Sequence, residues 1–84
     1  MTPIQELLNR IRWDEEFGRG DFVIGYHDRF DDSLVEVPLK ALSFAEDNHF
    51  SFEIMDDEGV VHSVPLHRIK AVRKNGTLIW HREH

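Results

Sequence analysis

Near its start the chain carries an apolar stripe with a helical period, formed by Ile4, Leu7, Leu8 and Ile11. This spacing places the four side chains on one face of an amphipathic helix that covers a core. Thr2 as N-cap, Pro3 at the first helical position and Gln5 three residues after the cap are typical of a helix start. The pattern predicts a helix that ends near Arg12 or Trp13.

From residue 22 onward, short segments rich in β-branched and aromatic residues replace the helical period. The strands predicted from them span 22–29, 34–37, 50–54, 60–64, 69–73 and 77–82. Tight turns are expected at 56–59 and at Asn75-Gly76, and a single helical turn at 38–42. Because short connections favour antiparallel pairing, we predict an α+β fold. Its N-terminal helix packs on a curved, mainly antiparallel sheet of about five strands.

The length and composition predict one domain, spanning residues 1–84, with a single modest core. A content of 40% hydrophobic and 31% charged residues is typical of a soluble globular protein. No apolar run approaches the roughly 20 residues that span a bilayer. Residues 1–5 lack the features of a signal peptide, so we expect a cytoplasmic location. The absence of cysteine excludes disulfides and cysteine-based zinc sites.

The net charge of −6 argues against sequence-independent binding to duplex nucleic acid, which depends on neutralising many phosphates. The charge is distributed unevenly, however. Residues 1–58 carry five basic and fifteen acidic side chains, a balance of −10, whereas residues 59–84 carry five basic and one acidic, a balance of +4. The cationic last third either attracts the acidic remainder within the fold or forms a local anion-binding site.

Two clusters of polar residues lie where predicted strands end. Pro65 lacks a ladder donor and therefore ends a strand, and His67 and Arg68 follow it. Asp28 and Arg29 close the first predicted strand. An arginine fork matches two phosphate oxygens, and a histidine adds a donor and, when protonated, a charge. We predict that these four polar residues converge on a phosphate, with Asp28 orienting an arginine or an imidazole.

Each cluster also has a purely structural interpretation. Asp28 and Arg29 are a dipeptide of a kind that often closes a turn or pairs with charges elsewhere. His67, between apolar neighbours, is equally suited to a half-buried role that ties its loop to backbone carbonyls. Both interpretations remain open at the level of the sequence.

Aromatic residues offer surfaces on which a base can stack. Trp13, Tyr26 and Trp80 are the candidates. Burial is the commoner fate of such rings, and we expect the Trp80 ring to lie mostly in the core. Arg82, two residues further along the same strand face, and His27 are additional candidates for the rim of the site.

Six histidines raise the question of a metal site. No two of them have the i, i+4 helical spacing of known zinc signatures. Glycine-rich phosphate-binding signatures are missing as well, because Gly18-Arg19-Gly20 is not followed by a helical pattern. We therefore predict neither a metal nor a cofactor.

Five separated motifs carry a resemblance to a known family. They span residues 11–14, 17–21, 24–29, 64–69 and 76–82. In this order they resemble the small archaeal and bacterial proteins described as the RNA cyclic-group end-recognition domain, over about residues 3–82. The resemblance implies a module that recognises RNA ends bearing a cyclic phosphate, found alone or joined to RNA-processing enzymes. It thus implies an RNA terminus, and an RNA-processing enzyme, as partners.

The resemblance also implies which positions contact the RNA end. Carried over residue by residue, they are Asp28, Arg29, His67 and Arg68, with Trp13, Tyr26, Trp80 and Arg82 as weaker additions. The residues themselves support binding of a phosphate but say nothing about RNA or a cyclic group.

Three functions are compatible with these features. The first is a non-catalytic RNA-binding module that captures a phosphorylated RNA end. The second is a small RNA phosphodiesterase or cyclase with His67 and His27 as acid and base. The third is a protein–protein adaptor that uses a sheet edge or an exposed aromatic patch. Persistence of a protein partner after loss of His67 and Arg68 would favour the adaptor.

Overall fold

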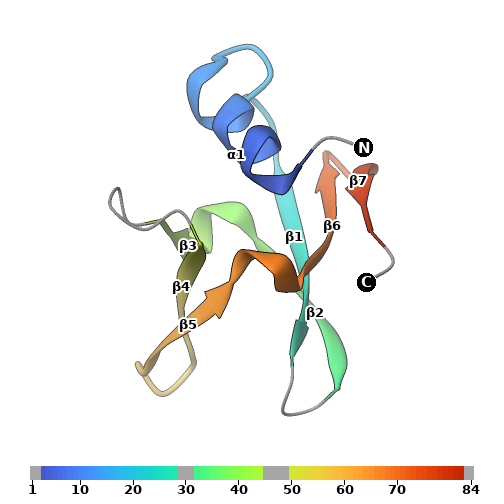
Figure 1. Cartoon of the computed structure of the whole chain (residues 1–84). Coiled ribbons are helices and arrows are strands. Elements are labelled where there is room, and N and C mark those ends of the chain that lie inside the picture. The colour runs from blue at the N-terminus through green and yellow to red at the C-terminus, as the bar shows by residue number, and fades with distance from the viewer. Residues whose placement is uncertain (1–2, 29–31, 45–49, 83–84) are drawn as a thin grey trace.

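The computed structural model describes residues 3–28, 32–44 and 50–82 (Figure 1). The helical elements within them are α1 (Ile4–Trp13) and the 3-10 turns η1 (Leu39–Ala41) and η2 (Leu66–Arg68). The strands are β1 (Phe22–Asp28), β2 (Ser33–Pro38), β3 (Leu42–Ser43), β4 (Ser51–Met55), β5 (Val61–Pro65), β6 (Ile69–Lys74) and β7 (Thr77–His81). The predicted α+β fold is confirmed, and every strand pairing is antiparallel.

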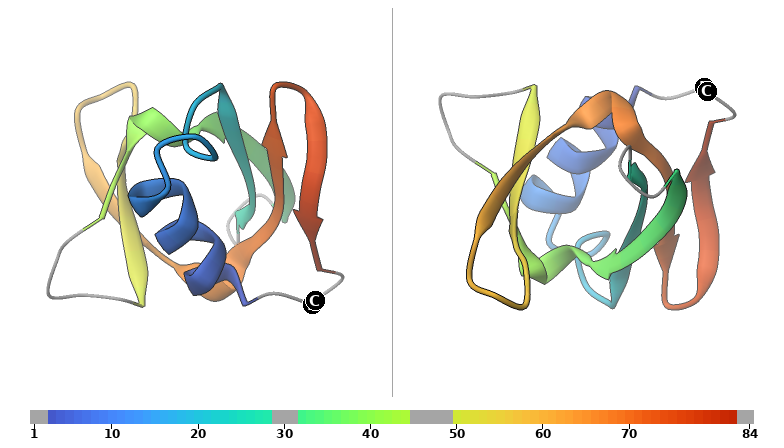
Figure 2. Two further views of the ribbon diagram at one scale, coloured as in Figure 1. Left: turned by 90° about the horizontal axis from the view of Figure 1, so that it is seen from above. Right: turned by 90° about the horizontal axis from the view of Figure 1, so that it is seen from below.

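The strands form two sheets rather than the single predicted sheet. One has the order β2-β1-β6-β7 and the other the order β3-β4-β5. The two-residue strand β3 was not predicted. Together the sheets and their connections form a ring of strands, and α1 lies across one end of this ring (Figure 2). The helix therefore covers a core that both sheets share.

The chain crosses between the sheets at two similar corners. Val-Pro-Leu occurs at 37–39 and again at 64–66, and each copy leads from a strand into a 3-10 turn. Pro38 and Pro65 have nearly equal extended backbone angles, φ −67° and −62° with ψ 140° and 142°. Because proline lacks the N–H that would continue the ladder, each strand ends there and the chain turns. The helical turn predicted at 38–42 is confirmed as η1.

The predicted helix is confirmed, with a start one residue later than expected. Pro3 is the N-cap instead of the first helical residue, and its carbonyl accepts the N–H groups of Glu6 and Leu7. Thr2, the predicted cap, lies outside the described residues. The helix ends at Trp13 as predicted. Asp14 follows it and accepts two backbone N–H groups of the next turn, which closes the helix end.

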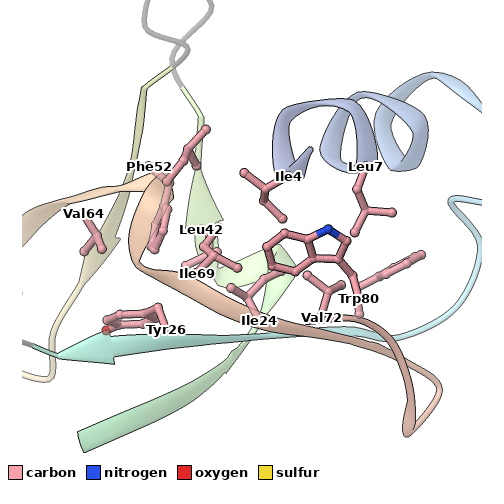
Figure 3. Close-up of a cluster of buried hydrophobic side chains, with 12 residues drawn as sticks. Ile4, Leu7, Ile24, Tyr26, Leu42, Phe52, Val64, Ile69, Val72 and Trp80 are labelled. Carbon is pink, nitrogen blue, oxygen red and sulfur yellow. The ribbon is translucent and has the colours of Figure 1, made fainter. Parts of the chain in front are cut away.

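The core joins α1 to both sheets (Figure 3). Its largest fully buried side chains are Phe52, Ile24, Ile69 and Val72. Ile4 and Leu7 of α1 lie against the indole of Trp80, which is only 7% exposed. The expectation that Trp80 belongs to the core is therefore confirmed. Tyr26 of the larger sheet meets Phe52 of the smaller one edge to face, with ring centroids 5.6 Å apart.

The predicted turn at Asn75-Gly76 is confirmed between β6 and β7. Both residues have positive φ, 52° and 84°, as a two-residue hairpin of this type requires. Asn75 also accepts the Asp21 N–H with its side-chain Oδ1 at 2.9 Å. This bond ties the β6–β7 hairpin to the segment that enters β1.

The hairpin between β4 and β5 is stabilised by one carboxylate. Oδ1 of Asp56 accepts the N–H groups of Glu58 and Val60 at 2.9 Å each, and Oδ2 lies 2.7 Å from Nε2 of His62. The hydrogen bond with His62, and then that with the Val60 N–H, lowers the pKa of the Asp56 carboxyl below its usual value. The charged form of Asp56 therefore favours the folded turn, which was predicted at 56–59.

We expect the stability contributed by Asp56 to be complete at neutral pH and lost as the pH falls through the lowered pKa. The unfolded chain binds this proton at a higher pH than the folded hairpin does, so protonation favours unfolding. Urea unfolding should show a difference between the wild type and Asp56→Asn that shrinks toward acid pH. The His62→Ala variant should raise the Asp56 pKa in a ¹³C NMR titration. A wild-type carboxyl that titrates at or above its usual value contradicts the assignment.

Candidate functional site

Two open clefts flank the η2 corner, and Pro65 lines both of them. We call the larger one the His67 cleft; its volume is about 640 Å³. It is lined by Pro3, Ile4, Gln5, Phe50, Ser51, Pro65, Leu66, His67, Trp80 and Arg82. This set contains an exposed histidine and an arginine but no carboxylate. Among the described residues, an anion entering the cleft therefore meets the Arg82 guanidinium and the His67 imidazole without a carboxylate in the lining.

Arg82 is held in the wall of the His67 cleft by the corner itself. Its Nε donates to the Ile69 carbonyl at 2.7 Å and its Nη2 to the Leu66 carbonyl at 2.8 Å. The guanidinium also lies over the Trp80 ring, with Cζ 5.1 Å from the ring centroid. These contacts fix the position of the cation and hold η2 against the end of β7. Arg82 was predicted as an additional residue of the binding site, but its hydrogen bonds at the corner were not predicted.

The first turn of α1 also lines the His67 cleft. Pro3, Ile4 and Gln5 belong to its wall, and η2 contacts α1 directly. Among the described residues, no side-chain hydrogen bond caps this end of the helix. The positive end of the helix dipole therefore adds to the favourable field for an anion in this cleft.

We call the smaller cavity the Arg68 cleft; its volume is about 360 Å³. It is lined by Tyr26, His27, Asp28, Ser63, Val64, Pro65 and Arg68. Asp28 at the end of β1 and Arg68 of η2 thus line one cavity, although forty residues separate them in sequence. Arg29, the remaining member of the predicted set, lies outside the described residues.

Hydrogen-bond donors in the Arg68 cleft include a protonated phenol. Burial, and then the negative charge of Asp28, raises the pKa of Tyr26 above its usual value. Its hydroxyl therefore stays protonated over the physiological range and can donate. His27 lies 2.7 Å from Asp32 through Nε2 and Oδ1, so this imidazole already has a carboxylate neighbour.

The predicted site residues are divided between the two clefts. His67 lines one cleft with Trp80 and Arg82, whereas Arg68 lines the other with Asp28. His27 and His67, the acid and base of the catalytic alternative, are separated in the same way. Within the described residues, the η2 corner thus presents its two polar side chains to two neighbouring surfaces.

The aromatic candidates differ in accessibility. Trp13 is 77% exposed at the end of α1 and lines neither cleft. Tyr26 and Trp80 line clefts, but both belong to the buried core. Phe50, which sequence analysis assigned only to a strand, is 78% exposed and lines the His67 cleft. Phe50 shares the apolar alternation of residues 50–54 with the buried Phe52, so no local signal indicated its exposure.

The cations of the last third of the chain serve both the fold and the clefts. Arg73 lies 3.7 Å from Glu36 on the other side of β1, and Nζ of Lys74 lies 4.5 Å from the centroid of the Phe17 ring. Arg68 and Arg82 line the two clefts. Arg73 thus pairs with an acidic residue of the remaining chain, whereas anion binding by Arg68 and Arg82 stays a prediction.

Metal binding and membrane crossing each need a recognisable arrangement of residues. Among the described residues, no group of three or more histidine and carboxylate side chains is arranged to hold a metal ion. Within the same residues, no helix has the length and apolarity needed to cross a membrane.

Comparison with known proteins agrees with the resemblance carried by the motifs. Residues 1–82 match the family described as the MJ1316 RNA cyclic group end recognition domain. A UPF0248 protein of Saccharolobus islandicus is 34% identical over 85 residues, covering 94% of this chain and 98% of the relative. A UPF0248 protein of Saccharolobus solfataricus is 31% identical over 85 residues, covering 94% and 95%. No solved structure matches the chain. The chain therefore belongs to the MJ1316 RNA cyclic group end recognition domain family, UPF0248.

Proposed function

We propose that this protein is a non-catalytic module that binds a phosphorylated RNA end, with a 2′,3′-cyclic phosphate as the preferred terminus. The observation that carries the proposal is the His67 cleft, where His67 and a fixed Arg82 share a wall that contains no carboxylate among the described residues. The family description, which names RNA cyclic group end recognition, supports the same assignment.

The chemistry of the His67 cleft suits a single terminal phosphate. A guanidinium has five N–H donors, and two of those of Arg82 bond backbone carbonyls. The remaining donors can face a phosphate oxygen, and the His67 imidazole supplies another donor beside them. Because the corner already fixes Arg82, little side-chain entropy is lost when the anion binds. A cyclic phosphate keeps two non-bridging oxygens, which match this pair of donors.

The Arg68 cleft provides the second contact in this proposal. Arg68 and the protonated Tyr26 hydroxyl bind the phosphate that precedes the terminal one, on the other side of Pro65. Asp28 orients Arg68. Arg29, the residue after Asp28 in the sequence, stays a predicted member of the set outside the described residues. The RNA strand thus passes over the η2 corner. Only two or three phosphates are engaged, so the slope of log affinity against log salt should be about −1 to −2.

A binding role without catalysis is favoured by the separation of the histidines. Acid–base cleavage of a phosphodiester requires two proton-transferring groups within hydrogen-bond reach of one phosphate. His27 and His67 line different clefts, and His27 is paired with Asp32. A cyclic-ended RNA incubated with the protein should therefore be recovered with its end unchanged by mass spectrometry.

The test compares three versions of one RNA oligonucleotide by fluorescence anisotropy. They differ only in the end, which is a cyclic phosphate, a 3′-phosphate or a free hydroxyl. The wild type should bind the cyclic end most tightly. His67→Ala and Arg68→Ala should each weaken binding about tenfold or more, because a hydrogen bond to a charged group contributes roughly 1.5–3 kcal/mol. For the hydroxyl end, His67→Ala should cause no loss of affinity, because no terminal phosphate is present. Arg68→Ala should still weaken binding of that end.

An exposed histidine and an exposed arginine outside the clefts provide matched controls. His81→Ala removes an exposed histidine of β7, and Arg19→Ala removes an exposed arginine of the loop before β1. Neither residue lines a cleft at η2, so neither change should alter affinity. Equal affinity for all three RNA ends, or equal losses in the His67 and His81 variants, would contradict the proposal.

A further inference from the structure

A third cavity opens beside the His67 cleft, between α1 and the smaller sheet. We call it the helix groove; its volume is about 510 Å³. It is lined by Gln5, Leu8, Asn9, Ile11, Arg12, Leu39, Leu42, Phe44, Ser51 and Leu66. Gln5, Ser51 and Leu66 line both the helix groove and the His67 cleft. The two cavities therefore adjoin each other around the first turns of α1.

The lining of the helix groove combines an apolar floor with a polar rim. Six of its residues are apolar: Leu8, Ile11, Leu39, Leu42, Phe44 and Leu66. The rim carries Gln5 and Asn9, four residues apart on one face of α1, with Arg12 and Ser51 nearby. As in the His67 cleft, the described part of the chain contributes no carboxylate to the lining. A planar heterocycle with hydrogen-bonding edges suits such a cavity, because its faces are apolar and its edge needs both donors and acceptors.

We propose that the helix groove holds the nucleobase of the terminal nucleotide and that Gln5 and Asn9 contact the edge of this base. The inference rests on the proposed function, which places the terminal phosphate in the adjoining His67 cleft. A base linked to that phosphate through a single ribose can reach the next cavity but no farther along the protein. Side-chain amides carry both donors and acceptors, so they discriminate among base edges. Recognition of the RNA end is then selective for the last base.

The volume of the groove indicates which bases it prefers. At about 510 Å³ it accommodates a purine, and the larger ring system covers more of the apolar floor than a pyrimidine does. Purine-ended RNA is therefore the expected ligand. Phe50 lines the His67 cleft and not the helix groove, so it offers a different surface on which the terminal base could stack.

The experiment uses RNA oligonucleotides with a 2′,3′-cyclic end that differ only in the terminal residue: each of the four bases, or an abasic ribose. Wild-type protein should bind the purine ends about tenfold more tightly than the abasic end. Asn9→Ala should reduce the differences among the bases several-fold and leave the affinity for the abasic end unchanged. Glu6→Ala, at an exposed position of α1 outside the cavities, is the matched control. It should change neither the differences in affinity among the bases nor the affinity for the abasic end.

NMR locates the base directly. Ring-current shifts from a bound purine end should appear on the methyl groups of Leu39 and Leu42, and the abasic end should not produce them. Abasic and purine ends of equal affinity would overturn this inference, while a His67-dependent preference for cyclic ends would leave the proposed function intact. Loss of the purine advantage in Phe50→Ala, with none in Asn9→Ala, would also overturn it. Loss of end preference altogether would instead remove the proposed function.

Discussion

Replacing Phe52 by alanine should remove a large part of the stability of this protein. The Phe52 side chain is fully buried, and its ring meets Tyr26 edge to face and Phe44 at 6.1 Å between centroids. Truncation of a buried phenylalanine costs about 3–5 kcal/mol, because the surrounding residues only partly fill the cavity. A domain of this size has a total stability of about 4–13 kcal/mol. Thermal denaturation should show a fall in melting temperature of about 12–40 °C.

The sequence supplies a matched control two residues earlier. Phe50→Ala makes the same chemical change at a side chain that is 78% exposed, so its effect on stability should stay within about 0.5 kcal/mol. Because Phe50 lines the His67 cleft, this variant should instead weaken binding of RNA ends. Similar losses of stability in both variants would show that Phe52 does not link the two sheets as described here.

Much of the fold was predictable because its signals are local. The stripe from Ile4 to Ile11 specifies the helix, and alternation with turn residues such as Asn75-Gly76 specifies the strands. The division into two sheets was not predictable from those signals. It depends on where the chain turns after Pro38 and Pro65, and periodicity within a strand does not say which neighbour the next strand will join.

The candidate site was predictable in its residue types but not in its geometry. His67 and Arg68 were identified as polar residues at a strand end, and the structure places both on the η2 corner. A 3-10 turn has three residues per turn, so consecutive side chains diverge by about 120°. This divergence accounts for the way two adjacent residues line different clefts. The 3-10 geometry of η2 therefore determines which cleft each of the two side chains lines, and residue types alone do not predict this.

Residues that join a site only through tertiary contacts carried no local signal. Asn9 lies on the polar side of an amphipathic helix, which normally faces solvent, and Gln5 was predicted only as part of the helix start. They line the helix groove because α1 crosses the end of the ring of strands beside η1 and β4 (Figure 2). Arg82 likewise depends on the approach of β7 to the corner formed by Leu66 and Ile69.

Replacing Arg82 by alanine should weaken both the fold and the binding of RNA ends. The guanidinium donates charge-assisted hydrogen bonds to the Leu66 and Ile69 carbonyls, and it lies over Trp80. A hydrogen bond to a charged group contributes about 1.5–3 kcal/mol, so losing both should cost about 3–6 kcal/mol of stability. In the proposed complex the same change removes the fixed cation of the His67 cleft. The affinity for a cyclic-ended RNA, measured below the melting temperature of the variant, should then fall about tenfold or more.

Arg82→Lys separates the two roles of this side chain. A lysine keeps the charge but presents a single ammonium, which cannot reproduce the fork that bridges two carbonyls. It should therefore recover part of the affinity while most of the stability loss remains. Arg73→Ala is the matched control, because Arg73 makes only an exposed ion pair with Glu36 at 3.7 Å, worth less than about 1 kcal/mol. If Arg82→Ala matches Arg73→Ala in melting temperature and in RNA affinity, then the corner does not depend on Arg82. The positive wall of the His67 cleft must in that case come from other residues.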